Sequence, residues 1–173
     1  MVNRLNRPFF EKFTQDILHQ RDMIDIPSYY AMSPSSGFWI LEYDGRCIGT
    51  IALDATPESI ILEQVPSKTK KGTKTPSSPI AVIRHFYVDE LYRKVGIQND
   101  LLAHVLRHAF RPDSSIERIK AHDSPLSYYI HQSLQSAGFY LDEHTETVGV
   151  FRWKLGTRIL ERAEWTKRAN ETR

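Results

Sequence analysis

The sequence has little cysteine, no long apolar run and almost no net charge. Cys47 is the only cysteine among 173 residues, so no intrachain disulfide can form and a reducing compartment is expected. We interpret Cys47 as a small structural residue and not as a nucleophile. No window approaches the roughly 18 to 20 apolar residues of a membrane-spanning helix. The first residues also lack the apolar core of a secretory signal, so we expect a cytoplasmic protein.

The charge balance gives no sign of a nucleic-acid or membrane partner. Lysine and arginine number 23 and aspartate and glutamate 21, which gives a net charge of +2. This is too small to imply a nucleic-acid or membrane partner by itself. Apolar residues make up 40% and charged residues 25%, as is ordinary for a globular protein. The length suits a single domain over residues 1–173.

A strand–turn–helix unit over residues 82–110 organises the chain. Residues 82–88 are mostly apolar, β-branched or aromatic and predict a strand. From Leu101, apolar residues recur at steps of three and four and predict a helix. The turn between them is basic and contains Gly96, and a helix start with an adjacent glycine suits a phosphate. On these residues alone, a plain turn with solvated basic side chains is the alternative.

The part before this unit predicts helix, hairpin and insertion. Residues 8–23 predict a helix within a helical amino-terminal part over 1–37. Residues 22–30 are expected to be a helix end or loop, because Pro27 biases Ile26 away from helix. Strands over 38–43 and 46–53 flank the hairpin turn Asp44-Gly45. Residues 56–79 predict a flexible basic insertion. We expect it to be solvated because no aromatic residues interleave with its lysines, although a nucleic-acid adaptor remains an alternative.

The part after the unit predicts alternating strands and helices. A strand over 116–122 leads to a helix that Asp123 or Ser124 caps and that ends near Gly138. Further strands are predicted near 140–141 and over 147–155. A carboxy-terminal helix and tail are predicted over 157–173.

The central turn resembles a known cofactor-binding motif. The residues Val88-Asp89-x-x-Tyr92-Arg93-x-x-Gly96-Ile97-x-x-x-Leu101-Leu102 are similar to the acetyl-CoA-binding motif of the GNAT N-acetyltransferases. That motif reads Arg/Gln-x-x-Gly-x-Gly/Ala, and its three defined positions are filled by Arg93, Gly96 and Gln98. Gln98 departs from the expected small residue.

The resemblance extends over about 38–153 and implies a fold. A second family signature is a strand, a helix and a closing Gly-Phe, matched by 119–122, the following helix and Gly138-Phe139. The GNAT fold is an α/β (α+β) fold with a mixed, mostly antiparallel sheet flanked by helices and splayed at the acetyl-CoA-binding strand. Its first strand and helix need more residues than precede Phe38. We therefore expect either an abbreviated amino-terminal part or an edge strand from a second subunit, as in a homodimer.

Within the family, the sequence resembles the camello or cysteine-S-conjugate acetyltransferase branch most closely. The likeness consists of a pattern before the hairpin and of a histidine, His85, three residues before the cofactor-binding valine. The residues that match the pattern are Asp22, Asp25, Ile26, Tyr30, Phe38 and Trp39.

The resemblance also implies a cofactor, acetyl-CoA, and the residues that hold it. The pyrophosphate is expected on the backbone of residues 93–99 at the helix start. The Val88 N–H is expected to donate to the thioester carbonyl. The predicted cofactor-binding residues are Phe86, Tyr87, Val88, Arg93, Lys94, Val95, Gly96, Ile97, Gln98 and Asn99.

Catalysis needs a base for the amine and an acid for the departing thiolate. His85 is the predicted base, with a packed or hydrogen-bonded histidine as an equal alternative. The family's usual acid is a tyrosine four residues before the Gly-Phe glycine, where Leu134 stands. The substitutes are Tyr128, Tyr129 and His131, which helical spacing cannot all aim at one sulfur; Tyr129 and His131 are the predicted catalytic pair.

Three residues are predicted to bind the substrate. Arg84 suits a carboxylate, although a solvated strand arginine is as good an interpretation. Tyr30 and His122 complete the set, since His122 lies at the carboxyl end of a strand. No cluster has the spacing of zinc ligands. His104 and His108 lack the intervening glutamate of a metalloprotease and are interpreted as helix surface.

The resulting hypothesis is an acetyl-CoA-dependent N-acetyltransferase that acts on the amine of a small molecule or amino-acid conjugate by direct attack in a ternary complex. One alternative is a catalytically weak acyl-CoA-binding regulatory module, suggested by Leu134, Val82 and Gln98. Another is a protein lysine or N-terminal acetyltransferase.

Overall fold

The computed structural model describes residues 18–57, 77–124, 127–148 and 152–171. They form a six-stranded sheet in the order β1-β2-β3-β4-β6-β5. The pair β3–β4 is parallel and the other neighbouring pairs are antiparallel, so the predicted mixed and mostly antiparallel sheet is confirmed. The strands are β1 (Gly37–Tyr43), β2 (Arg46–Asp54), β3 (Ile80–Val88), β4 (Arg118–Asp123), β5 (Tyr140–Val148) and β6 (Trp153–Glu161).

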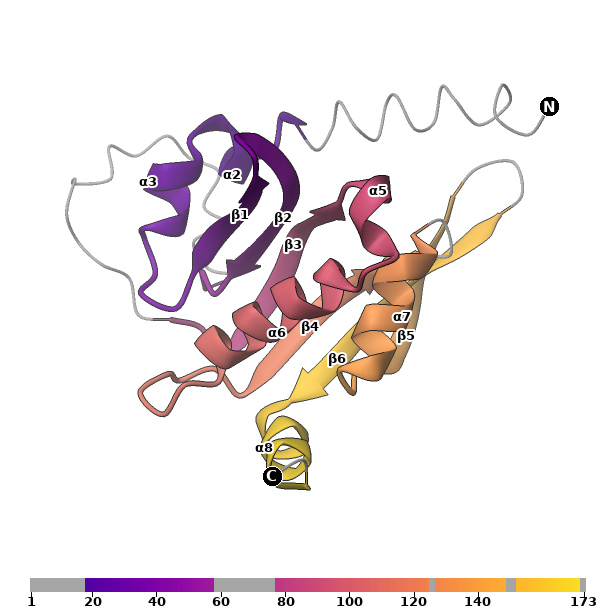
Figure 1. The fold of residues 1–173 in the computed structure, drawn as a ribbon. Coiled ribbons are helices and arrows are strands. Elements are labelled where there is room, and N and C mark those ends of the chain that lie inside the picture. Colours follow the sequence, from indigo (N-terminus) through magenta and orange to yellow (C-terminus); the bar gives the residue numbers. More distant parts are fainter. Residues whose placement is uncertain (1–17, 58–76, 125–126, 149–151, 172–173) are drawn as a thin grey trace.

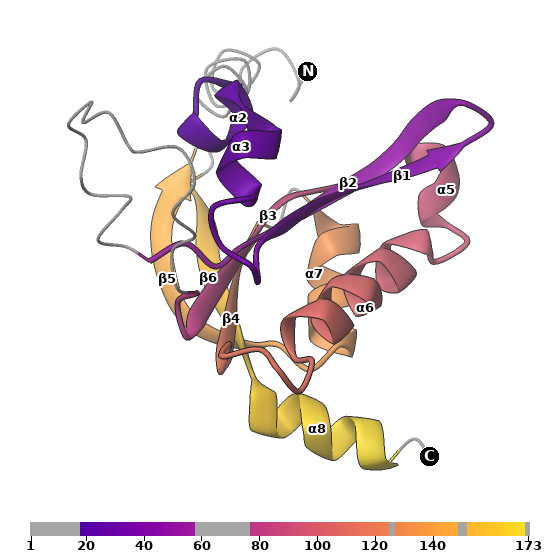
Figure 2. The same cartoon turned by 90° about the vertical axis from the view of Figure 1, so that its left-hand side faces the viewer.

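Helices flank the sheet on both faces (Figure 1). Figure 2 shows α6 and α7 on one face of the sheet and α2 and α3 on the other, beside β1 and β2. The helices are α2 (Arg21–Ile24), α3 (Ile26–Tyr30), α5 (Glu90–Arg93), α6 (Ile97–Ala109), α7 (Tyr128–Ser136) and α8 (Arg162–Glu171).

The main core lies between the sheet and α6. The helix buries Leu101, Leu102, Val105, Leu106 and Ala109, the stripe predicted from its three- and four-residue steps. They pack with buried residues of the sheet and α7, namely Ile51, Leu53, Ala81, Ile83, Val88, Ile119, Ala121 and Leu134. The predicted Asp44-Gly45 turn also forms, with a φ of 69° at Gly45.

A second, smaller cluster lies under α3 on the opposite face. Tyr29 and Tyr30 pack there on Ala52 of β2, beside Phe38 of β1. Because α6 covers one face of β2 and α3 the other, six of the last seven residues of this strand are buried. Strands β2 and β3 therefore lie between α6 and α7 on one face of the sheet and α2 and α3 on the other.

The amino-terminal prediction fails in two described places. Gln20 is extended, so the predicted helix over 8–23 is interrupted before α2. Residues 26–30 form α3, although Pro27 led us to expect a helix end or loop. The proline is accommodated because it stands in the first turn, where its missing N–H costs nothing. Asp25 caps the helix by accepting from the Ser28 N–H at 3.1 Å. The predicted helix over 8–23 falls mostly on residues 1–17, outside the described part of the chain, as does most of the 56–79 insertion.

The carboxy-terminal prediction also needs correction. Residues 157–161 belong to strand β6, and only residues 162–171 form the predicted helix. The strand forms because β6 pairs with both β4 and β5, which buries Ile159 and Leu160 within the sheet. Alternating burial and helical spacing could not be distinguished over so few residues.

Two smaller corrections concern α7 and α6. Ser127 occupies the N-cap position of α7, so neither Asp123 nor Ser124 caps it, and Asp123 is the last residue of β4. His104 is exposed on α6, as predicted, but His108 is half-buried against Trp39, with ring centroids 5.0 Å apart. Burial, with a smaller effect of the nearby Arg111 charge, lowers the pKa of His108.

Candidate active site

The parallel pair β3–β4 opens towards its carboxyl end. Pairing runs from Ile80–Arg118 to Ile83–Ala121, while β3 continues to Val88 and β4 to Asp123. The last residues of β3 therefore leave the parallel ladder, and their backbone groups on that side need other partners. Ligands commonly bind at the carboxyl ends of strands in open α/β sheets.

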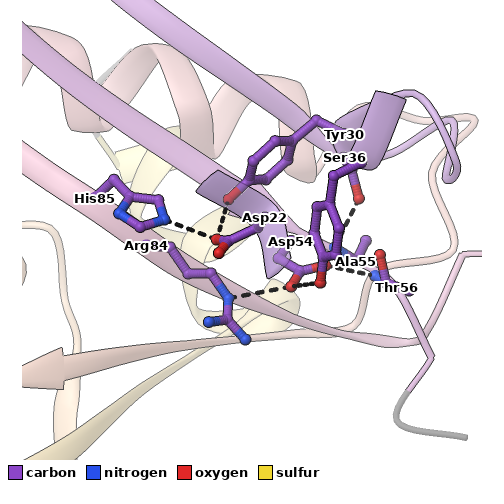
Figure 3. A network of polar contacts seen from close by, with 9 residues as sticks. Asp22, Tyr30, Ser36, Asp54, Ala55, Thr56, Arg84 and His85 are labelled. Carbon is purple, nitrogen blue, oxygen red and sulfur yellow. Dashed lines mark hydrogen bonds and ion pairs between the residues drawn. The ribbon is translucent and has the colours of Figure 1, made fainter. Parts of the chain in front are cut away.

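A β-bulge re-aims β3 where this opening begins. Arg84 pairs with Ala52 and Tyr87 with Thr50, so His85 and Phe86 together oppose a single residue of β2. His85 has a φ of 50°, a value that non-glycine residues rarely adopt. The Thr50 hydroxyl donates to the His85 carbonyl at 2.8 Å and holds the bulge. The bulge lets Arg84 and His85, which are adjacent in sequence, point into the same polar network (Figure 3).

His85 contacts a buried carboxylate of α2. Its Nε2 lies 2.7 Å from Asp22 Oδ2, and the Tyr30 hydroxyl donates to the same oxygen at 2.9 Å. The side chains of His85 and Asp22 are 11% and 3% exposed, so this contact is shielded from solvent. Burial, together with the negative charge of Asp22, raises the pKa of Tyr30.

Arg84 makes a parallel arrangement with the next carboxylate. Its Nε lies 3.1 Å from Asp54 Oδ2, and the Tyr29 hydroxyl donates to that oxygen at 2.9 Å. Asp54 Oδ1 also accepts from the Thr56 N–H at 3.0 Å. Burial, with a contribution from the Asp54 charge, raises the pKa of Tyr29 to about 12. Figure 3 shows the two carboxylates side by side, each facing one residue of β3.

The turn after β3 forms a cradle at the start of α6. Asp89 caps the short helix α5 by accepting from the Leu91 N–H at 3.0 Å. Gly96 is the N-cap residue of α6 with a left-handed φ of 84°. A Cβ at Gly96 would meet only the Asn99 side chain, at 3.8 Å, so the outer side of the turn is open. The first N–H groups of a helix lack the usual acceptor four residues earlier and can bind an anion, although here the Asn99 N–H also donates to the Gly96 carbonyl at 2.8 Å.

A polar groove continues from this cradle between α6 and α7. Its cavity volume is about 310 Å³. The buried Oε1 of Gln98 has no hydrogen-bond partner among the described residues, so a bound ligand or water could satisfy it. The groove is lined by Gln98 and Asn99 of α6 and by Gln132, Ser133, Gln135 and Ser136 of α7.

Tyr129 of α7 reaches the open end of β3. The Val88 N–H donates a hydrogen bond to the Tyr129 hydroxyl. Arg93 lies over the Tyr129 ring, 4.1 Å from its centroid, and its Nε donates to the Val88 carbonyl at 2.8 Å. Burial raises the pKa of Tyr129, and the Val88 hydrogen bond and the Arg93 charge partly offset this effect. The hydroxyl is therefore protonated at neutral pH.

His131 faces a different cluster. Its Nδ1 lies 3.0 Å from Asp123 Oδ2, and Arg158 of β6 donates to the same oxygen at 2.6 Å. Tyr128 stacks on the His131 ring. Tyr129 and His131 thus point to different partners, as helical spacing requires.

The predicted site residues divide into separate groups. Arg84 and Tyr30 lie in the buried network, where Tyr30 is only 6% exposed, and His122 is exposed on β4. The cofactor predictions are contiguous along the opening and the cradle: Phe86, Tyr87 and Val88 end β3, and Arg93, Lys94, Val95, Gly96, Ile97, Gln98 and Asn99 form the turn into α6. Among the latter, the Arg93 side chain turns towards Val88 and away from the helix start.

Sequence reasoning assigned no role to either carboxylate, although Asp22 belongs to the pattern that resembles the camello branch, and it missed the α7 side of the groove. Asp22 is 63 residues from His85, and no local pattern joins them. Its position beside a tyrosine eight residues later gives no periodic signal either. The polar face of α7 could have been found, because Gln132, Gln135 and Ser136 are spaced three and four residues apart.

Comparisons with known proteins agree with this fold. The model of the acetyltransferase (GNAT) family matches residues 1–148, and the chain therefore belongs to this family. A search of curated proteins found no match.

Solved structures share the fold at low identity. A GNAT-family acetyltransferase from Streptococcus pneumoniae has a TM-score of 0.59 and 14% identity over 84% of this chain and 78% of that chain. The spermidine/spermine N-acetyltransferase SpeG from Vibrio cholerae gives 0.55 and 11% over 79% and 70%. A proposed acetyltransferase from Salmonella typhimurium, solved with its cofactor acetyl-CoA, gives 0.51 and 16% over 73% and 64%.

The chain is an acetyltransferase whose family uses acetyl-CoA, and its residues fit that cofactor. The open left-handed turn at Gly96 and the helix start behind it suit a pyrophosphate. The polar groove offers amide and hydroxyl groups to the rest of the nucleotide. Gln98 stands where a small residue is usual, but its side chain lines the groove and does not fill the turn.

No metal centre accompanies this site in the described part of the chain, where no group of three or more histidine, cysteine, aspartate or glutamate side chains could hold an ion. Within the same residues, no helix is long and apolar enough to cross a membrane.

Proposed function

We propose that this acetyltransferase acetylates the amine of a small molecule or amino-acid conjugate by direct attack in a ternary complex. The observation that carries the proposal is the pair of groups at the open end of β3. There the Val88 N–H and the protonated Tyr129 hydroxyl meet, and His85 lies three residues earlier on the same strand. The hydrogen-bond donor (Val88 N–H) and the base (His85) thus lie on the last residues of β3, and the acid (Tyr129) contacts this strand end from α7.

The chain's own residues can supply each proton transfer. Acetyl-CoA, when bound, supplies a thioester whose carbon–sulfur bond breaks as the amine nitrogen bonds to the carbonyl carbon. His85 takes the proton that the amine loses, and Tyr129 donates the proton that the sulfur needs. In the complex the Val88 N–H would leave the Tyr129 hydroxyl and donate to the carbonyl oxygen, where it stabilises the negative charge that develops, and this frees the Tyr129 hydroxyl to face the sulfur. Both side chains then exchange protons with solvent and return to their starting states.

The remaining residues hold the two reactants. The cradle at Gly96 and the groove along α7 would hold the pyrophosphate and nucleotide of the cofactor. In this proposal Arg84, whose side chain is 28% exposed, is available to a substrate carboxylate while its Nε stays in the ion pair with Asp54. His122 is exposed at the end of β4 and completes the acceptor side. His131 is bound to Asp123, so we assign the acid to Tyr129 first.

A second candidate is an acyl-CoA-binding module with weak transfer. It is favoured by Leu134, which stands where the family's tyrosine is usual and is fully buried in the core. Tyr129 must therefore replace that tyrosine from five residues earlier, about 1.4 helical turns away, or transfer is slow. The acceptor class is open as well, since protein lysines and N-termini are alternative amines.

Measurement of thiol release from acetyl-CoA with a panel of amines tests the proposal. The panel contains spermidine, S-benzylcysteine, free amino acids, a peptide with an N-terminal alanine and a peptide with an internal lysine. We expect at least one small amine to be acetylated faster than both peptides. Faster acetylation of a peptide would favour a protein acetyltransferase. Cofactor binding without acetylation of any amine would favour the weak module.

Three finer predictions stay proposals. Placement in the camello branch rests on the sequence pattern alone, and the neighbours reported above give it no support. S-benzylcysteine in the panel tests it, because a cysteine S-conjugate is that branch's substrate. Cytoplasmic location and a homodimer rest on the sequence arguments given first.

A further inference from the structure

His85 is held in a strained conformation inside a strand. Among the described residues, the positive-φ residues other than glycine are Asp44, His85 and Arg152. Asp44 and Arg152 lie in the turns that join β1 to β2 and β5 to β6, where such angles are expected. His85 lies within β3, so the surrounding structure must hold its backbone there. Strain of this kind is found where the aim of a side chain matters.

The contacts of His85 fix which ring nitrogen carries the proton. A carboxylate can only accept hydrogen bonds, and Asp22 Oδ2 accepts from Tyr30 as well as from His85 Nε2. In the neutral ring the N–H must then be on Nε2, which leaves the lone pair on Nδ1. We infer that Asp22 and Tyr30 are positioning residues that hold His85 as the Nε2–H tautomer, so that Nδ1 takes the proton of the acceptor amine. This inference rests on the proposed function.

The contacts of Asp54 provide a control for those of Asp22. Asp54 is buried like Asp22, accepts from a neighbouring tyrosine of α3, and pairs with the residue before His85. Its partner, Arg84, cannot lose a proton in a protein, so this half of the network can only hold a charge in place. Both halves have a buried carboxylate that accepts from a tyrosine of α3, so comparing Asp22→Leu with Asp54→Leu tests whether an effect requires the carboxylate that is bonded to His85.

Within the described part of the chain, five elements bring titratable, charged or aromatic groups close to His85. Asp22 comes from α2, Tyr29 and Tyr30 come from α3, Asp54 comes from β2, and Arg84 precedes it on β3. From β1, the uncharged ring of Phe38 lies 6.0 Å from the imidazole, centroid to centroid. Of these, only Asp22 is bonded to the ring, so its removal is the direct test.

The first experiment reads the ring nitrogens by ¹⁵N NMR of the full-length protein at a pH where histidine is neutral. We expect Nε2–H on His85, with a downfield, slowly exchanging proton that is present in Asp54→Leu and lost in Asp22→Leu. Asp22→Asn, which keeps an acceptor oxygen, should retain part of the signal. An Nδ1–H tautomer in the wild type, or an unchanged signal in Asp22→Leu, overturns the inference.

The second experiment is a double-mutant cycle in kcat with the best amine of the panel. Asp22→Leu and Tyr30→Phe should lower kcat, the former at least about 10-fold, while KM for acetyl-CoA stays within two-fold. In a His85→Ala background, Asp22→Leu should change kcat by less than two-fold, because Asp22 acts through His85. A full loss that persists in that background means a merely structural role and overturns the inference. If Asp22→Leu does not fold, Tyr30→Phe completes the same cycle.

The two experiments separate failure of the inference from failure of the proposed function. A wild-type enzyme that acetylates amines but shows no coupling between Asp22 and His85 refutes the inference alone. A wild type that binds acetyl-CoA and acetylates no amine refutes both, even where the NMR signal shows the expected tautomer.

Discussion

Burial controls the protonation of three tyrosines around the site. Tyr29 and Tyr30 each donate to a buried carboxylate, and Tyr129 is half-buried against Arg93 and Val88. In each case burial is the largest cause of a raised pKa. All three hydroxyls therefore keep their protons at neutral pH, where two of them orient carboxylates and one is available as an acid.

Tyr129→Phe removes the proposed acid without altering the ring that packs on Arg93. We expect kcat to fall about 10- to 100-fold, near the lower end of the effect of a general acid, and KM for acetyl-CoA to stay within about three-fold. Steady-state kinetics against acetyl-CoA measure both. Tyr140→Phe, an exposed tyrosine on β5, is the control and should retain wild-type kinetics. Equal kcat in the two variants would remove Tyr129 from the mechanism.

The raised pKa of Tyr29 predicts an alkaline loss of stability. The folded-state pKa of about 12 exceeds the unfolded value of about 10. The contribution is therefore complete below pH 10 and is lost as the pH rises from 10 to 12. After allowance for solvent screening it is about 1 to 2 kcal/mol.

Urea unfolding at pH 9 to 12 tests this prediction. The free energy of unfolding should decline less steeply in Tyr29→Phe than in the wild type, while Tyr43→Phe, at an exposed tyrosine, keeps the wild-type decline. Parallel declines in all three proteins would show that the Tyr29–Asp54 contact does not stabilise the fold in this way.

At the scale of elements, the turn from α5 into α6 is the part to which we assign cofactor binding. Gly96 and Gly45 both have left-handed φ values, so a side chain strains either turn. They differ in location, since Gly96 begins α6 and Gly45 lies in the β1–β2 turn with nothing within 4 Å of an added Cβ. The pair therefore separates backbone strain from loss of the cofactor.

Gly96→Trp should abolish acetyl-CoA binding because the ring occupies the space in which the pyrophosphate must approach the backbone. Gly45→Trp should lose a similar amount of stability and keep wild-type affinity. Isothermal titration calorimetry with acetyl-CoA measures both. An affinity for Gly96→Trp within a few-fold of the wild type would mean that the cradle lies elsewhere.

The elements that the sequence predicts well are those with local signals. The Asp44-Gly45 hairpin, the apolar stripe of α6 and the glycine turn before it all follow from neighbouring residues. Residues 157–161 were mispredicted because their strand exists only through pairing with β4 and β5. Asp123 looked like a helix cap, yet it is the partner of Arg158, 35 residues away. Contacts between residues so far apart in the sequence cannot be predicted from the pattern of neighbouring residues.

The candidate site divides in the same way. The turn proposed to bind the cofactor is continuous in sequence, and its glycine and the helix start after it could be predicted. The proposed acceptor side is assembled from α2, α3, β2 and β3, and the bulge that turns His85 towards Asp22 is visible only in the register of β2 and β3. His85 was predicted as base or packed residue with equal weight, and the structure shows a buried, hydrogen-bonded histidine.

At the scale of the whole molecule, Arg162 joins α8 to the far end of α6. Its Nε donates to the Ile116 carbonyl and its Nη2 to the Ser114 carbonyl, each at 2.7 Å. Its Nη1 donates to the carbonyls of Phe110 and Arg111 at the end of α6. One guanidinium thus satisfies carbonyls that follow the helix whose other end begins at the cradle.

Arg162→Met should destabilise the protein by about 2 to 3 kcal/mol, because it leaves several carbonyls without a donor. Lys167→Met, an exposed residue on the same helix, should stay within about 0.5 kcal/mol of the wild type. Thermal unfolding of the two variants measures the difference. Equal melting temperatures would show that water replaces the arginine at no cost.

The assignment of the opening, the cradle and the groove to acetyl-CoA is tested most directly by thermal melting with acetyl-CoA, CoA and ATP. A ligand at 100 times its dissociation constant adds about 2.7 kcal/mol, which corresponds to a shift of roughly 5 to 10 °C for a chain of this size. We expect such a shift with acetyl-CoA and CoA and none with ATP, which lacks the pantetheine arm that would enter the opening between β3 and β4. No shift with acetyl-CoA at saturation, or an equal shift with ATP, would contradict the assignment.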